Sequence, residues 1–212
     1  MATFIVAIIF LHNINMKVLG RLFILTVIIS SCSEDNSRDG DRYFNGGDYL
    51  AALEAYNKHL EMRPNDLEVI FRRGKAQEQL GNEELAFADY NRVIQMDDRH
   101  LDALQALGGY YYRNEDYDNA HYYFEMAVNI DKDNVIIHLN KGNANQKRGK
   151  LREALIDYNL AISINKDYGE AYLSRGTVKL LLGGKSSACS DFKIAQSLGA
   201  YGAEKAIKGY CK

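Results

Sequence analysis

The stretch that decides the fold is GKAQEQLGNEELAFADY, residues 74–90. Its small and aromatic residues recur along the chain at intervals of 34 residues. Three columns repeat five times: Gly40, Gly74, Gly108, Gly142 and Gly176; Ala52, Ala86, Ala120, Ala154 and Ala188; Tyr56, Tyr90, Phe124, Tyr158 and Phe192. A fixed period of this length indicates a repeat protein, in which each unit buries its apolar face against its neighbours.

Each repeat is expected to form two helices joined by a tight turn, as in residues 67–80 and 83–96. Gly74 and Ala86 are small because the two helices approach each other closely there, and an aromatic side chain fills the space beside them. Glycines at the turn (Gly47, Gly81, Gly149 and Gly183) supply the positive φ angle that a helix end requires.

These columns resemble those of the tetratricopeptide repeat, which has a small residue, an alanine and an aromatic residue at its eighth, twentieth and twenty-fourth positions. The resemblance implies an all-α, right-handed superhelical solenoid of about five helix pairs over residues 40–200, followed by a capping helix over residues 201–212. The first repeat departs from the pattern, because Ser33 to Asp39 lacks apolar residues. Its first helix is therefore expected to begin near Arg38 or later.

Residues 1–31 are predicted to be a signal peptide, with Met16 as the true start. A basic segment, Met16–Arg21, precedes an apolar run and two serines. Ile29-Ser30-Ser31-Cys32 resembles the bacterial lipobox, which implies that Cys32 is lipidated and that residues 32–39 form a tether. The alternative is an uncleaved membrane anchor, but the apolar run after Arg21 is shorter than the roughly 20 residues that span a bilayer.

An acidic segment after Cys32 resembles the surface-export signals of Bacteroidetes lipoproteins, although a solvated tether explains it equally well. The resemblance implies a lipid-anchored protein of the cell envelope, at the outer membrane, facing the periplasm or the cell surface. In such a compartment the remaining cysteines, Cys189 and Cys211, form an even pair that invites a disulfide. Two buried free thiols are the alternative.

The sequence offers no catalytic machinery, and we expect neither an enzyme nor a cofactor or metal. The five histidines are scattered, and no pair has the spacing of a zinc site. His138 falls at a core position and is interpreted as a packed side chain. The formal net charge is -2, which excludes the basic surface of a nucleic-acid-binding protein.

The resemblance also implies that the first helix of each repeat lines a groove for a protein segment. The positions that face this groove are Phe71, Arg72, Lys75, Gln79, Tyr112, Arg113, Asn143, Gln146 and Lys147. Their cations and amides suit an acidic or carboxylate-bearing partner, whereas a solvated face without a ligand is the alternative. Two functions remain open: a lipid-anchored adaptor that binds a partner protein, and a structural or assembly subunit of an envelope complex or homo-oligomer.

Overall fold

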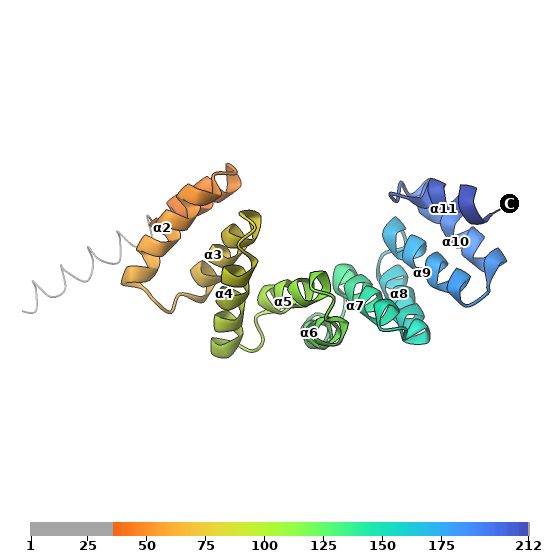
Figure 1. Cartoon of the computed structure of the whole chain (residues 1–212), viewed down its shortest axis with the longest axis horizontal. Coiled ribbons are helices and arrows are strands. Elements are labelled where there is room, and N and C mark those ends of the chain that lie inside the picture. Colours follow the sequence, from red (N-terminus) through yellow and green to blue (C-terminus); the bar gives the residue numbers. More distant parts are fainter. Residues whose placement is uncertain (1–35, 212) are drawn as a thin grey trace, which may run out of the picture. The chain divides into compact units, whose positions relative to one another are not determined.

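The computed structural model describes residues 36–211, and within that range it consists of helices and turns with no strand (Figure 1). A helix over residues 36–45 is followed by α2 (Tyr49–Met62), α3 (Leu67–Gln79), α4 (Glu83–Met96), α5 (Leu101–Arg113), α6 (Tyr117–Ile130), α7 (Val135–Lys147), α8 (Leu151–Ile164), α9 (Gly169–Leu181), α10 (Lys185–Ser197) and α11 (Ala203–Tyr210). The described residues thus form five helix pairs and a terminal helix, as expected from the repeat.

The described part of the first helix agrees with the expected start near Arg38 to within two residues. The chain is already helical at residue 36, two residues before Arg38. Polar residues do not prevent a helix when they pair along its surface, and Arg42 lies 3.1 Å from Asp39 one turn earlier.

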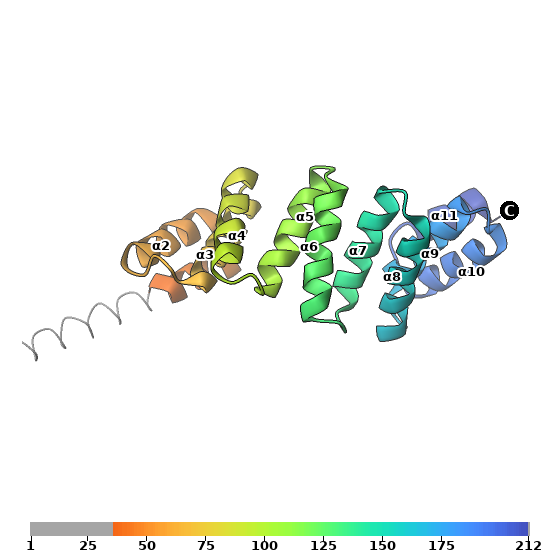
Figure 2. The same ribbon diagram turned by 90° about the horizontal axis from the view of Figure 1, so that it is seen from below.

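The chain divides into two compact units, one ending at Asp89 and the other beginning at Tyr90. In the first unit α2 packs against α3. In the second unit each helix from α5 to α11 packs against the next one, and Figure 2 shows α5 and α6 running antiparallel as a pair. Local packing between sequence neighbours is what the 34-residue period predicts.

Close approach of the two helices in a pair is visible at the glycine column. A Cβ atom on these glycines would lie 2.4–2.7 Å from an aromatic ring atom, in the pairs Gly40–Tyr56, Gly108–Phe124, Gly142–Tyr158 and Gly176–Phe192. The rings are buried, as are all five alanines of the alanine column. The aromatic ring therefore occupies the volume that the glycine leaves open, as predicted.

The turn glycines adopt the positive φ angles that the sequence predicted. Gly47, Gly81, Gly149 and Gly183 have φ angles between 75° and 84°. At the equivalent turn of the third repeat the chain carries Glu115, which adopts a φ of 61°. This conformation costs a residue with a Cβ atom about 1–2 kcal/mol, so the repeat tolerates a locally strained turn there.

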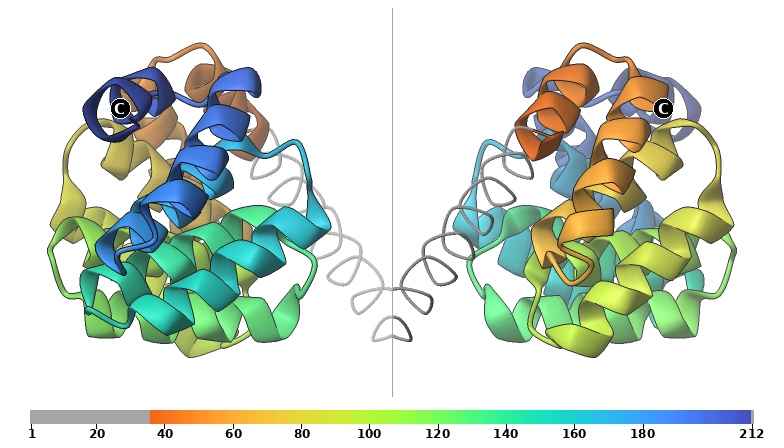
Figure 3. Two further views of the ribbon diagram at one scale, coloured as in Figure 1. Left: turned by 90° about the vertical axis from the view of Figure 1, so that its right-hand side faces the viewer. Right: turned by 90° about the vertical axis from the view of Figure 1, so that its left-hand side faces the viewer.

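The terminal helix α11 covers one side of α10 (Figure 3). Ala203 is its buried residue, and the Sγ atoms of Cys189 in α10 and Cys211 after α11 are bonded at 2.08 Å. The structure thus has the disulfide that the even pair of cysteines suggested. In the chain-entropy description a loop of this size contributes about 3 kcal/mol to stability.

Replacing Gly142 by alanine is expected to lower the free energy of unfolding by about 1–3 kcal/mol, because the added methyl group would overlap the buried Tyr158 ring. Denaturant unfolding followed by circular dichroism measures the change. Gly209→Ala is the matched control, because a Cβ atom added there would meet no described atom within 4 Å. Equal stability of Gly142→Ala and the native protein would contradict this account of the glycine column.

Candidate interaction site

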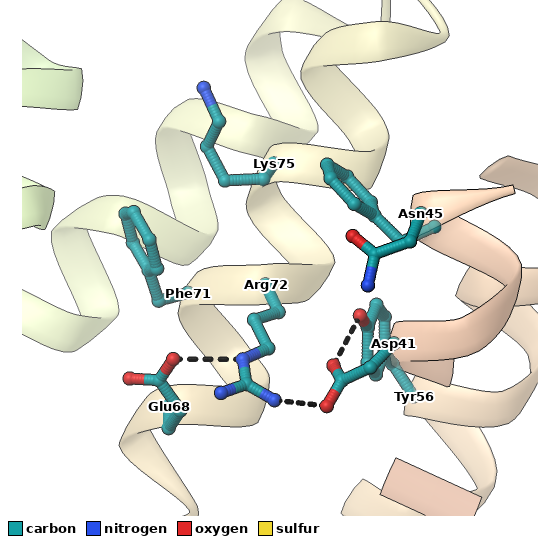
Figure 4. A pocket seen from close by; sticks show the side chains of 8 residues that line it. Asp41, Asn45, Tyr56, Glu68, Phe71, Arg72 and Lys75 are labelled. Atoms are coloured by element: carbon teal, nitrogen blue, oxygen red, sulfur yellow. Dashed lines mark hydrogen bonds and ion pairs between the residues drawn. The ribbon is translucent and has the colours of Figure 1, made fainter. Parts of the chain in front are cut away.

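A pocket of about 390 Å³ lies in the first unit, between the helix of residues 36–45 and α3 (Figure 4). Its walls combine aromatic rings with charged and amide groups: Asp41, Phe44, Asn45, Tyr56, Glu68, Phe71, Arg72 and Lys75. Three of the predicted groove residues, Phe71, Arg72 and Lys75, are therefore brought together on α3. The pocket has the volume and the mixed lining of a site for a side chain or a small ligand.

The charges of this pocket are largely paired within the protein. Arg72 donates to Asp41 and, at 2.8 Å, to Glu68. The Tyr56 hydroxyl donates to the other oxygen of Asp41 at 2.9 Å. Burial opposes the charged form of Arg72, but the hydrogen bonds to the two carboxylates raise its pKa on balance. Burial, followed by the hydrogen bond to Asp41, raises the pKa of Tyr56.

Lys75 also has an internal partner, because its Nζ atom lies 2.5 Å from an Oε atom of Glu78. In Figure 4 its ammonium group points away from the Arg72 network. Gln79, one turn further along, is exposed and is not among the residues that line the pocket. An acidic partner at this site would have to compete with carboxylates that the chain itself supplies.

The remaining predicted groove residues lie in the second unit. Tyr112, Arg113 and Asn143 line a smaller pocket of about 170 Å³ together with Gly109, Phe124 and Asn140. The side-chain oxygens of Asn143 and Gln146 both lie 2.8 Å from the Tyr158 hydroxyl. The exposed Lys147 ammonium sits 5.9 Å from the centre of the Tyr117 ring, a cation–π distance.

Five pocket residues were not predicted to line a groove: Asp41, Phe44, Asn45, Tyr56 and Glu68. The first three lie in the helix whose pattern was interpreted as degenerate, and a pocket position cannot be assigned on a helix of uncertain start. Glu68 precedes Arg72 by four residues, and this helical ion-pair spacing was a signal that could have found it. Cys32 lies outside the described residues, so its lipidation stays a prediction.

A second set of interactions missed from the sequence joins successive repeats. Arg73 and Arg175 each donate to an aspartate of the same repeat and to an asparagine of the preceding repeat. The contacts are Arg73–Asp89 at 2.5 and 2.8 Å, Arg73–Asn57 at 2.9 Å, Arg175–Asp191 at 2.7 and 2.8 Å, and Arg175–Asn159 at 2.8 Å. We call this arrangement the polar ladder.

In the fourth repeat Lys141 takes the place of the arginine in the polar ladder. Its Nζ atom lies 2.7 Å from Glu125 and 3.1 Å from Asp157. The hydrogen bond from Lys141 lowers the pKa of Glu125, whereas burial raises the pKa of Asp157 in spite of the same lysine. Removing one partner from a buried pair of this kind leaves the other charge uncompensated, at a cost of about 3–5 kcal/mol.

The described residues contain no group of three or more histidine, cysteine, aspartate or glutamate side chains placed to hold a metal ion. Among the helices described, none combines the length and the apolar character needed to cross a membrane. His138 is buried, and its Nε2 atom lies 2.8 Å from the Lys132 carbonyl oxygen. This contact agrees with its interpretation as a packed histidine.

Comparison with known sequences identifies tetratricopeptide repeats in this chain, in residues 38–100 and again in residues 136–168. A small glutamine-rich tetratricopeptide repeat-containing protein 2 of Mycosarcoma maydis is 29% identical over 115 residues, which is 54% of this chain and 32% of that protein. Superkiller complex protein 3 of Mus musculus is 32% identical over 69 residues, which is 32% of this chain and 4% of that protein. The chain therefore spans about a third or less of the length of these relatives.

Solved structures with the same fold include MamA, with a TM-score of 0.73 at 22% identity over 82% of this chain and 96% of that one. MamA from Desulfovibrio magneticus RS-1 gives a TM-score of 0.74 at 17% identity over 78% of this chain and 94% of that one. A thermophilic tetratricopeptide-repeat protein of Thermus thermophilus gives 0.61 at 18% identity, with 83% and 96% coverage. The chain has the all-helical fold of a tetratricopeptide solenoid.

Proposed function

We propose that this chain is a lipid-anchored interaction protein of a bacterial cell envelope, which binds a segment of a partner protein on the first helices of its repeats. The observation that carries the proposal is the pocket of about 390 Å³, whose wall includes Phe71, Arg72 and Lys75. Tetratricopeptide repeats in general bind protein partners, and this pocket offers both aromatic and polar contacts to a peptide.

The charge pattern supports a partner with one apolar anchor and a moderate negative charge. Phe44 and Phe71 provide the apolar wall of the pocket. Arg72 is engaged by two carboxylates, and Lys147 in the second unit is exposed. Electrostatic attraction from the second unit would then guide association, and burial of an apolar side chain would supply most of the affinity.

The double substitution Lys75→Gln with Lys147→Glu is expected to reduce retention of an acidic partner about tenfold, because one attractive cation is removed and the other becomes repulsive. Glutamine at the first position avoids a like charge beside Glu78. Full-length protein in detergent serves as bait in a pull-down from envelope extract. Lys58→Gln with Lys166→Glu is the matched control, since both lysines are exposed and lie outside the two pockets. Arg72 is left intact because its loss would break the contacts to Asp41 and Glu68. A partner retained equally by both baits would place recognition on another surface.

The lipid anchor is tested separately. Intact-mass analysis of the mature protein from a bacterial envelope is expected to give a chain that begins at Cys32 and carries acyl chains. Cys32→Ala is the control, and this variant should be recovered without the added mass. An unmodified chain that retains residues 16–31 would contradict the anchor and leave the groove proposal untouched.

A structural or assembly subunit is the second candidate, and an exposed apolar stripe on α8 favours it. Ile156, Leu160 and Ile164 are 60%, 42% and 37% exposed and follow one another at intervals of four residues, on one face of the helix. Such a stripe is typical of a helix that packs against another helix. A second copy of the chain would bury it in a self-complementary contact.

Light scattering on the purified protein separates the two candidates. A defined oligomer that Leu160→Lys converts to monomer would support the assembly subunit, because a buried lysine ammonium is costly to desolvate. Glu153→Lys serves as the control for added charge on the same helix. A native protein that stays monomeric at high concentration would contradict the second candidate.

A further inference from the structure

The terminal helix α11 begins in the register of a further repeat. Ala203, its first residue, stands 34 residues after Gly169, the first residue of α9, and the same interval separates the starts of α9, α7, α5 and α3. Both helices pack against the second helix of the preceding repeat, α9 against α8 and α11 against α10 (Figure 3). The terminal helix therefore occupies on α10 the place that α9 occupies on α8.

The contact that joins the two helices differs in kind between these two places. In the fourth repeat Leu155 of α8 packs in an apolar cluster that includes Ala171 and Val178 of α9. Cys189 of α10 has the position of Leu155 one repeat later, and it is bonded to Cys211 at the end of α11. A reversible covalent bond thus stands where the preceding repeat has an apolar contact.

The other contacts of α11 are slight for a docked helix. Ala203 is the only one of its eight described residues that is buried, whereas α9 buries four residues in the equivalent place. Just before the helix, the Tyr201 amide donates a hydrogen bond to Glu170 of α9 at 3.1 Å, and this bond is exposed. A helix shorter than about 12 residues is marginal in water on its own. The docking of α11 therefore depends on its disulfide.

The disulfide is also open to attack from solvent. Cys189 and Cys211 are both partly exposed, and their neighbours Ser190 and Tyr210 are exposed. Thiol–disulfide exchange requires a thiolate to approach one of the two sulfur atoms, and exposed disulfides are the ones that are reduced most easily. The bond that holds α11 is therefore one that a reductant can reach in the folded protein.

We propose that the Cys189–Cys211 disulfide is a redox-controlled lock on α11. A dithiol reductant would attack one sulfur through a thiolate, form a mixed disulfide and then close its own disulfide with its second thiol. Two electrons and two protons pass to the protein, and both cysteines become thiols. The oxidised chain keeps α11 docked, whereas the reduced chain releases it and uncovers the side of α10 on which it packs. This lock is independent of the partner-binding groove and of the lipid anchor.

Amide hydrogen exchange of the full-length protein, read by mass spectrometry with and without dithiothreitol, tests the lock. Reduction is expected to speed exchange in residues 203–211 at least about tenfold, because a short helix without its tether is unfolded most of the time. Exchange in α7 and α8 should stay unchanged, because their packing against each other does not depend on the bond. Thiol alkylation confirms that both cysteines have been reduced.

The double variant Cys189→Ala with Cys211→Ala is the control for the reductant. Its α11 should exchange at the rate of the reduced native protein, whether or not dithiothreitol is present. Unchanged protection of α11 after both thiols have formed would overturn the proposal, since the helix would then dock without the bond. A disulfide that dithiothreitol reduces only in denaturant would also overturn it. So would loss of protection throughout α5 to α10, because the bond would then hold the fold rather than the terminal helix.

Discussion

Close contact between a glycine and an aromatic ring sets the spacing of four of the described helix pairs, and the packing around them depends on it. The ring of Tyr158 lies over Gly142 so closely that a single methyl group would not fit. This contact sets the distance between α7 and α8, and it recurs at Gly40–Tyr56, Gly108–Phe124 and Gly176–Phe192. Because the contact is the same in these pairs, side chains 34 residues apart have similar neighbours. What distinguishes two such positions is then the type of side chain that each one carries.

Most of the fold was predictable because it follows from residues that recur at the same position. The glycine, alanine and aromatic columns predicted the helix pairs. The turn glycines predicted where the first helix of a pair ends. Glu115 could not be recognised as a turn residue with positive φ, since no single residue type marks that conformation when glycine is absent.

The candidate sites were only partly predictable. Repeat positions indicated that Phe71, Arg72 and Lys75 face one side of α3, and they do line one pocket. Repeat positions could not show that Asp41 would reach Arg72 from the preceding helix, 31 residues earlier in the chain. The net charge of a groove depends on such long-range pairs, and a count of cations along one helix face overstates its attraction for acidic partners.

The polar ladder makes the junctions between repeats differ. Lys141 pairs with Glu125 of the preceding repeat, whereas Arg73 and Arg175 face asparagines, Asn57 and Asn159. The repeats share the same glycine and aromatic columns. They differ in the side chain, asparagine or glutamate, that the cation contacts in the preceding repeat. Duplication or reordering of repeats would keep each cation with the aspartate of its own repeat, and would exchange only its second partner, between an asparagine amide and a carboxylate.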